Sequence, residues 1–260
     1  MTSGSGYRER NSTADRALTL LEMFTDDRLE VSAAEVAENL GVARSTAYRY
    51  LQTLVQSQFL SEDGRGGFRL GMKVLQLARL ARQGFGLSEM ALPVMRELAN
   101  EFHQTVLLTR QMGSAIICLE REESSAQYVR FSFERGSILS LNAGASAMVL
   151  LAWLPESQAR ELLTTVKLQR FTSTTLTDPD EILARLRLIK AEGHAFSVGE
   201  VDATSAGIAA PIFRPNGEVL AAVSVALVRS RVSDLDVDRI TARVVESAAL
   251  LTEQVAVLDV

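Results

Sequence analysis

The feature that most constrains this chain is a series of helix and turn signals near its N-terminus. Ser32 and Glu35 have the spacing of a capping box, which starts a short helix. Gly41 stands where that helix needs a left-handed residue in order to end. The apolar spacing predicts a further helix over residues 44–56, and the glycine-rich stretch 63–67 (DGRGG) then separates two short strand-like runs. The sequence therefore predicts a short helix, a longer helix and a hairpin, in that order.

An amphipathic helix precedes this series. It begins near Thr13, and its end is expected near Asp26-Asp27. Its apolar face is formed by Ala17, Leu20, Leu21 and Phe24. Three helices followed by a glycine-tipped hairpin have the order of a winged helix-turn-helix, a fold that places its recognition helix in the major groove of DNA.

The distribution of charge supports this interpretation. The 260-residue chain has a formal net charge of −5, which by itself argues weakly against nucleic-acid binding. However, residues 41–85 contain seven basic and two acidic side chains. This basic block coincides with the helix over residues 44–56 and with the hairpin. A charge run is more often only a solvated helix face, and that alternative stays open.

The residues expected to contact DNA lie on the exposed side of the helix over residues 44–56, at the hairpin tip and at two helix starts. Arginine suits guanine edges, and hydroxyl and amide groups reach bases or phosphates. Arg65, between glycines, is expected to reach a minor groove or a phosphate, and Arg16 and Ser32 are expected to add phosphate contacts. The recognition-helix candidates are Arg44, Ser45, Thr46, Tyr48, Arg49 and Gln52.

The rest of the chain mixes helices and strands. The periodicity predicts a helix over residues 71–83, apolar over so wide an arc that it must pack on more than one side. Beyond it, the elements lack a strict βαβ alternation, so we expect an α+β domain with an antiparallel sheet flanked by helices. The pattern gives helices at 91–102, 145–154, 156–164, 179–192 and 234–257, and strands at 105–110, 115–120, 128–133, 138–141, 206–213 and 218–228.

The second half shows no catalytic set and no metal or cofactor site. Gly144-Ala145-Ser146 begins like the nucleophile-elbow motif G-x-S-x-G, but the second glycine is missing. A serine hydrolase that uses Ser146 is therefore only an alternative. Cys118, the single cysteine, excludes an internal disulfide and is expected to be a buried, inert thiol. The presence of only two histidines argues against a His-rich zinc site. No apolar run is long enough to span a bilayer and no secretory signal is visible, so we expect a cytoplasmic protein.

One local pattern favours ligand binding. Small residues from Asn142 to Ser146 lead into a buried helix, whose backbone N–H groups attract carboxylates. Gly207 and Ser224, on the two strands after residue 205, are placed to line the same cavity. Tight helix–sheet packing explains the small residues equally well.

The chain resembles the IclR family of bacterial transcription regulators over residues 13–256. The resemblance rests on residues 43–54 (ARSTAYRYLQTL), 68–71 (FRLG), 177–179 (TDP), 192–195 (EGHA), 209–213 (AAPIF) and 216–219 (NGEV) in this order. It implies a winged helix-turn-helix domain over residues 13–70, a linker helix over 71–84 and a GAF-like effector-binding domain over 85–260, after a disordered tail over 1–12.

The resemblance also implies function. Members bind pseudo-palindromic operator DNA as homodimers or as tetramers built from two dimers, and respond to a small organic effector, commonly a carboxylate or aromatic acid. We expect the effector to bias the dimer between two spacings of its DNA-binding domains through the linker helix.

The family's ligand positions carry over only in part. The backbone at Gly144 and Ala145 and the hydroxyl of Ser224 match. Gly207 replaces a frequent cysteine, Ser197 falls near a frequent acidic residue, and Ala226 replaces a second serine. Fewer polar anchors suggest a larger or less polar effector, with Met148 filling part of the wall. Besides the hydrolase, a winged-helix module that binds proteins and not DNA remains an alternative.

Overall fold

The computed structural model describes residues 12–25, 27–84, 86–125, 131 and 133–258. The chain forms two compact units that divide after Ala81, and each is described by itself. The expected tail over residues 1–12 lies outside the described residues, except for Ser12, which is already helical. The division falls within the stretch expected to be a linker helix.

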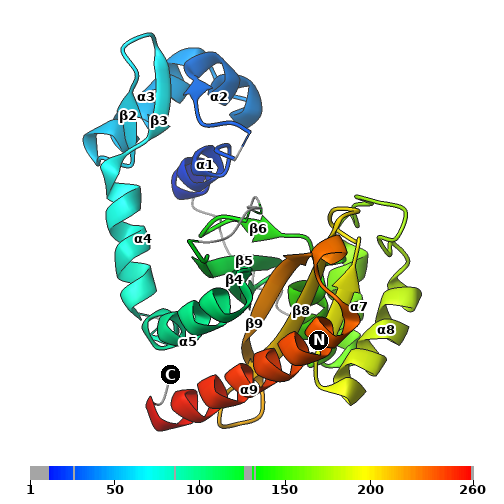
Figure 1. Ribbon diagram of the computed structural model, residues 1–260. Helices are drawn as coiled ribbons and strands as arrows, with labels where there is room; N and C mark the ends of the chain where they lie inside the picture. Colours follow the sequence, from blue (N-terminus) through cyan, green and yellow to red (C-terminus); the bar gives the residue numbers. More distant parts are fainter. Residues whose placement is uncertain (1–11, 26, 85, 126–130, 132, 259–260) are drawn as a thin grey trace, which may run out of the picture. The chain divides into compact units, whose positions relative to one another are not determined.

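The N-terminal unit contains the expected helices and hairpin (Figure 1). The capping box at Ser32 and the left-handed Gly41, with φ of 62°, are both confirmed. The first helix ends at Leu21, earlier than expected, and a turn brings Phe24 onto the core. The elements are α1 (Ser12–Leu21), β1 (Val31–Ser32), α2 (Ala33–Leu40), α3 (Arg44–Gln56), β2 (Leu60–Glu62), β3 (Gly67–Leu70) and α4 (Met72–Gly84).

A small antiparallel sheet, in the order β1-β3-β2, fixes the hairpin against these helices. The two-residue strand β1 was not predicted, because two residues carry no alternation that the sequence pattern could reveal. Phe68 on β3 and Leu51 on α3 are essentially fully buried. The hairpin is therefore anchored in the same core as α3.

The C-terminal unit is built on a six-stranded antiparallel sheet in the order β6-β5-β4-β9-β8-β7, which confirms the α+β class. Its elements are α5 (Leu87–Phe102), β4 (Thr105–Met112), β5 (Ala115–Glu122), β6 (Ile138–Leu139), α6 (Ala145–Ala152), α7 (Glu156–Thr165), α8 (Pro179–Glu192), β7 (Ala195–Val198), β8 (Ser205–Phe213), β9 (Val219–Val228), the short 3-10 helix η1 (Arg229–Arg231) and α9 (Asp234–Leu258). The strand expected over 128–133 falls largely outside the described residues, and the edge strand β7 was not predicted.

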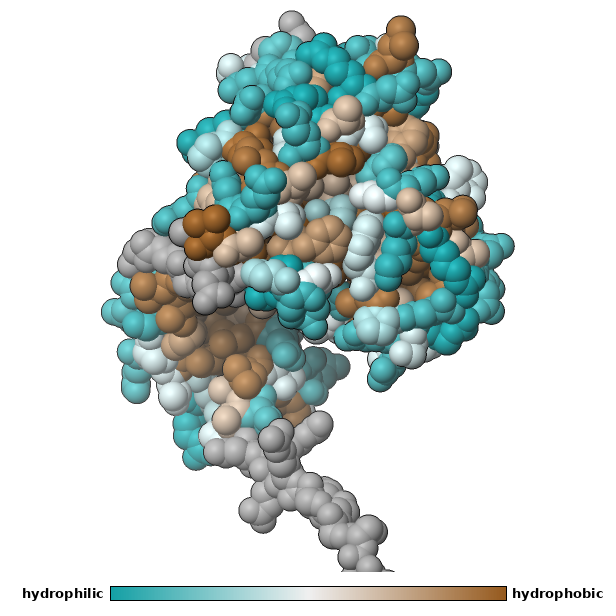
Figure 2. Space-filling model, turned by 90° about the horizontal axis from the view of Figure 1, so that it is seen from below, coloured by the Kyte–Doolittle hydropathy of each residue, from teal (hydrophilic) through white to brown (hydrophobic). Residues whose placement is uncertain are grey.

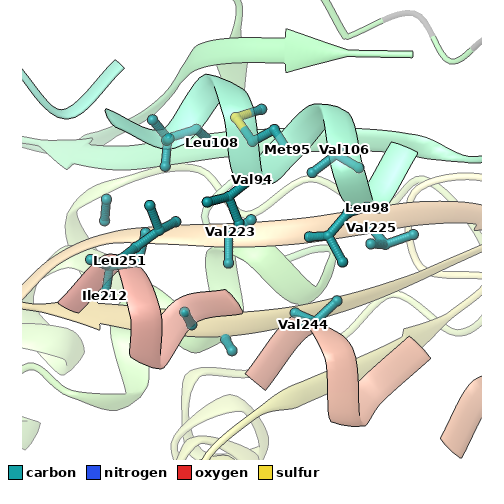
Figure 3. Packing of buried hydrophobic residues seen from close by; sticks show 14 of the residues in the cluster. Val94, Met95, Leu98, Val106, Leu108, Ile212, Val223, Val225, Val244 and Leu251 are labelled. Atoms are coloured by element: carbon teal, nitrogen blue, oxygen red, sulfur yellow. The ribbon is translucent and has the colours of Figure 1, made fainter. Parts of the chain in front are cut away.

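Helices α5 and α9 cover one face of this sheet. Successive side chains of a strand point to opposite faces, so alternate residues belong to one layer. On β8, Ile208 and Ile212 join the core that packs against these two helices. Figure 3 shows Leu98 from α5 and Val244 from α9 close to Val225 of β9. The core of this layer is built from apolar side chains.

The opposite face carries α6, α7 and α8. All eight residues of α6 are buried, which explains why its sequence is apolar on every side. Ala209 and Ala222, from β8 and β9, belong to this second core with α6 and α8. The small side chains of the strands let α6 lie close to the sheet. Next to this contact the packing opens into a cavity.

The surface mixes polar and apolar side chains. On the face drawn in Figure 2, hydrophobic residues lie in patches between hydrophilic ones. Among the helices of the described residues, none combines the length and the apolar character needed to cross a membrane.

Candidate functional site

The candidate recognition helix α3 is anchored by one face and exposes the other. Ala47 and Leu51 are buried against the core. Ser45, Tyr48 and Arg49 are exposed on the opposite side, as the sequence predicts. Helical spacing places these three side chains on one surface because residues three and four apart are neighbours.

The hairpin tip is shaped by Asp63. Its carboxylate accepts hydrogen bonds from the backbone N–H groups of Arg65, at 2.7 Å, and Gly67, at 2.9 Å. These two bonds, the first the stronger cause, lower the pKa of Asp63. Gly64 and Gly66 have positive φ, which only glycine adopts readily. The turn therefore holds the backbone of Arg65 while its side chain extends into solvent.

The basic block divides into paired and unpaired arginines. Arg69 forms an ion pair with Glu30 beside the hairpin. Within the described part of the chain, the exposed side chains of Arg44, Arg49 and Arg65 have no ion-pair or hydrogen-bond partner. These three cations are therefore available to an external anion.

Other predicted contact residues already have partners within the unit. Arg16 donates a hydrogen bond to the hydroxyl of Tyr50, at 3.2 Å. The Ser32 hydroxyl donates to Glu35 and accepts from its backbone N–H, so the cap already uses it. Gln52 donates to Glu62 on β2. The ring of Tyr48 lies edge-to-face with Phe68, with centroids 6.1 Å apart. Thr46 is half-buried at the helix start.

The C-terminal unit contains a cavity of about 500 Å³ between α6, the sheet and the loops around them. Six of the seven predicted effector-binding residues line it, namely Gly144, Ala145, Ser197, Gly207, Ser224 and Ala226. Met148 does not. It is fully buried in the core beneath α6, because it lies about one turn further along a helix that is covered on every side.

The inner end of the cavity is polar but uncharged. The Ser146 hydroxyl donates to that of Ser224 at 2.8 Å, and both side chains are buried. Gly207 leaves room here, because a Cβ atom on it would lie 3.4 Å from the Cβ of Ala145 and 3.7 Å from the Oγ of Ser197. Hydroxyl groups and small residues therefore form this end.

A carboxylate of the chain itself occupies the start of α6. The backbone N–H of Gly144 donates to Glu200 at 2.9 Å. Glu200 is only 3% exposed and forms an ion pair with Arg185 of α8. The first N–H group before α6 is thus not free, contrary to the expectation from the sequence. No local pattern could reveal this contact, because it joins residues 56 positions apart.

The outer wall of the cavity is mainly apolar. Phe131 and Phe133 are stacked, with ring centroids 6.4 Å apart, and both line the cavity with Phe171. Asp202 is the one charged residue among the described lining residues. Its carboxylate accepts hydrogen bonds from the hydroxyl and the backbone N–H of Thr204, which lower its pKa. The cavity thus suits a ligand with an apolar body.

The described residues do not assemble a catalytic or metal site. His103 bonds to Ser124 and His194 lies next to the carbonyl of Glu192, whereas Ser146 bonds to Ser224, so neither histidine is placed as a base for Ser146. No group of three potential metal ligands occurs in the described ranges. Cys118 is fully buried, and burial raises the pKa of its thiol to about 11. The burial that the sequence predicts for this thiol is confirmed.

Comparison with known proteins identifies both units. The IclR helix-turn-helix domain matches residues 13–64, and the C-terminal domain of bacterial IclR transcriptional regulators matches residues 80–252. The HTH-type transcriptional regulator KipR of Bacillus subtilis is 27% identical over 95% of this chain and 98% of its own length.

Solved structures give the same result. An IclR transcriptional regulator from Alicyclobacillus acidocaldarius superposes with a TM-score of 0.82 at 25% identity, covering 94% of this chain and 98% of that one. An IclR homologue from Microbacterium hydrocarbonoxydans, in complex with 4-hydroxybenzoate, has a TM-score of 0.79 at 25% identity, covering 93% and 98%. The chain therefore belongs to the IclR family of bacterial transcriptional regulators, DNA-binding proteins with a C-terminal ligand-binding domain that are not enzymes.

Proposed function

We propose that this regulator binds operator DNA through α3 and the hairpin, and that a small organic effector in the cavity modulates the binding. The observation that carries the DNA contact is the set of exposed, unpaired arginines. Arg44 and Arg49 on α3 would contact base edges with Ser45, Thr46 and Tyr48, while Arg65 would hold the flanking backbone. Gln52, Arg16 and Ser32 would contribute at the edges of this surface, from positions fixed by their partners.

The first test is to sequence the DNA fragments that the purified protein retains from fragmented genomic DNA. The expected result is a pseudo-palindromic consensus. Arg49→Ala should then cost about 1–3 kcal/mol and relax the preference at one position of each half-site, as expected for a lost bidentate base contact. Retention without any sequence preference would contradict the proposal.

The expected assembly is a homodimer or a tetramer built from two dimers. Several large apolar side chains of the N-terminal unit are exposed along α4, which a second copy would cover. They are Met72, Leu75, Leu77 and Leu80. Leu75→Ser with Leu80→Ser should shift sedimentation toward the monomer, and unchanged sedimentation would argue against this contact.

The proposed effector has a flat apolar body and one or two hydrogen-bonding groups. Phe131, Phe133 and Phe171 would pack on its body, and the hydroxyls of Ser197 and Ser224 would bind its polar end, beside Gly144, Ala145 and Ala226. Because a homologue was crystallised with 4-hydroxybenzoate, this compound is a suitable first probe. Effector binding would change the spacing of the DNA-binding domains through α4.

Titration calorimetry tests the effector class. 4-Hydroxybenzoate and related aromatic acids and amides should bind more tightly than oxoacids of two or three carbon atoms. Gly207→Cys places a larger side chain in the space beside Ala145 and should weaken the aromatic ligands most. If only the small oxoacids bind, the proposed effector class is wrong.

A further inference from the structure

Two aromatic rings of the cavity wall lie on a segment without regular secondary structure. Phe131 and Phe133 line the cavity, but the described residues between β5 and β6 form neither helix nor strand. Interactions other than the backbone hydrogen bonds of a helix or sheet must therefore fix this part of the wall.

Arg121 forms hydrogen bonds with Phe131 and with Glu134. It pairs in register with Leu107, a cavity-lining residue, so its side chain lies on the cavity face of the sheet. Its guanidinium donates to the carbonyl of Phe131 at 3.0 Å and to the carboxylate of Glu134 at 2.7 Å. The side chain is only 13% exposed. One planar guanidinium group therefore connects Phe131 and Glu134, which lie on either side of Phe133 in the sequence.

The preceding residue of β5 holds the segment from the other face of the sheet. Glu120, whose side chain is only 5% exposed, forms an ion pair with Arg135 at 2.7 Å. Arg135 also donates to the carbonyl of Arg121 at 3.1 Å. Two consecutive residues of β5 therefore form ion pairs with two consecutive residues of the segment. Glu120 pairs with Arg135 on one face of the sheet, and Arg121 pairs with Glu134 on the other.

Backbone hydrogen bonds also attach residues 136 and 137 to β5. Gly136 donates to the carbonyl of Cys118 at 2.7 Å, and Cys118 donates to the carbonyl of Ser137 at 3.0 Å. The ion pairs thus extend the contact with β5 from residue 137 back to the aromatic rings. In each pair the β5 partner is largely buried and the segment's partner is exposed, and Arg121 also pairs with Glu123. Losing the segment's partner leaves the buried charge with fewer partners, so each pair favours the observed position of the segment.

We propose that Arg121 and Arg135 are positioning residues that hold Phe131 and Phe133 as a flat aromatic wall of the ligand cavity. They act through the wall and need not touch the ligand. The wall they maintain selects planar ligands, because offset stacking rewards a flat partner. This role rests on the proposed use of the cavity, but the geometry of the wall can be measured without effector or DNA.

The test is a single-tryptophan reporter in the full-length protein. Trp153→Phe removes the only tryptophan, and Phe133→Trp introduces one into the wall. Adding Arg121→Met, which keeps the length of the side chain but removes its donors, should increase acrylamide quenching and shift the emission to longer wavelength. Glu134→Gln, a milder change at an exposed position, should give a smaller effect in the same direction.

Two controls separate positioning from general loosening. Arg187→Met breaks a surface ion pair with Glu156 in the same unit and should leave the reporter unchanged. In protein that keeps Trp153, which packs edge-to-face on Phe213, Arg121→Met should leave the quenching of Trp153 unchanged. The proposal fails if the reporter is equally shielded with and without Arg121, or if Trp153 becomes accessible to the same degree. Neither result would bear on DNA binding.

Discussion

At the scale of single residues, Cys118 links burial to pH. Its side chain is fully buried in the sheet, and desolvation, with the nearby charge of Glu120 as a second cause, raises the pKa of the thiol from 9.0 to about 11. Below pH 9 the thiol is protonated in both the folded and the unfolded chain. Above it, the unfolded chain loses the proton first, so stability decreases as the pH rises toward 11.

We predict that Cys118→Val flattens this alkaline decrease. The free energy of unfolding, from urea titrations at several pH values between 8 and about 11, should fall less steeply in the variant, whatever its stability at neutral pH. Native protein should also resist thiol reagents at neutral pH, because the thiolate is the reactive form. Rapid labelling of the folded chain would show that the burial is wrong.

Residues whose partners are close in sequence were the predictable ones. The capping box at Ser32 and the C-cap at Gly41 follow from spacing alone. Glu200 has no such signal, because its contacts with Gly144 and Arg185 join distant segments. The cavity-lining position of Gly207 was predictable from its place on a strand beside Ser224, whereas the position of Met148 away from the cavity depends on how α6 packs.

At the scale of elements, the junction between β3 and α4 leaves no space for a side chain at Gly71. Gly71 is buried, and its N–H donates to the carbonyl of Phe59 at 2.7 Å. A Cβ atom at this position would lie 2.2 Å from the carbonyl oxygen of Gln58, which is backbone and cannot rotate away. The chain can therefore turn from hairpin to helix here only with glycine.

We predict that Gly71→Ala destabilises the N-terminal unit by about 1–3 kcal/mol, the usual cost of overpacking. Urea unfolding followed by circular dichroism measures the change. Gly64→Asn is the matched control in the same unit, because no atom lies near its Cβ position and asparagine tolerates its positive φ. Equal stability of the two variants would contradict the close contact at Gly71.

Elements with a strong pattern were also predicted with their bounds. Helices α3 and α8 begin and end where periodicity and caps place them. The hairpin of β8 and β9 turns at Asn216-Gly217, where Gly217 has φ of 83°. By contrast, β1 and β7 have only two and four residues at sheet edges, so their position depends on pairing with distant strands and not on their own pattern.

At the scale of the whole molecule, charge is separated along the sequence. The net charge of −5 would repel DNA on average, yet residues 41–85 are basic and include the three exposed, unpaired arginines. Binding to DNA releases condensed counterions in proportion to the phosphates that are neutralised, so affinity must fall with salt. A local group of cations is sufficient for this effect, because charges beyond a Debye length, about 8 Å at physiological salt, are largely screened.

We therefore predict that Arg65→Ala weakens binding to specific and unrelated DNA by a similar factor and reduces the salt slope by about one per lost phosphate contact. Arg187→Ala is the control, because Arg187 is also exposed but forms an ion pair with Glu156 in the other unit. Fluorescence anisotropy with labelled duplexes at several salt concentrations measures both slopes. An unchanged slope for Arg65→Ala would place the hairpin tip away from the phosphates, and equal losses for both variants would mean that total charge, not the hairpin tip, determines affinity.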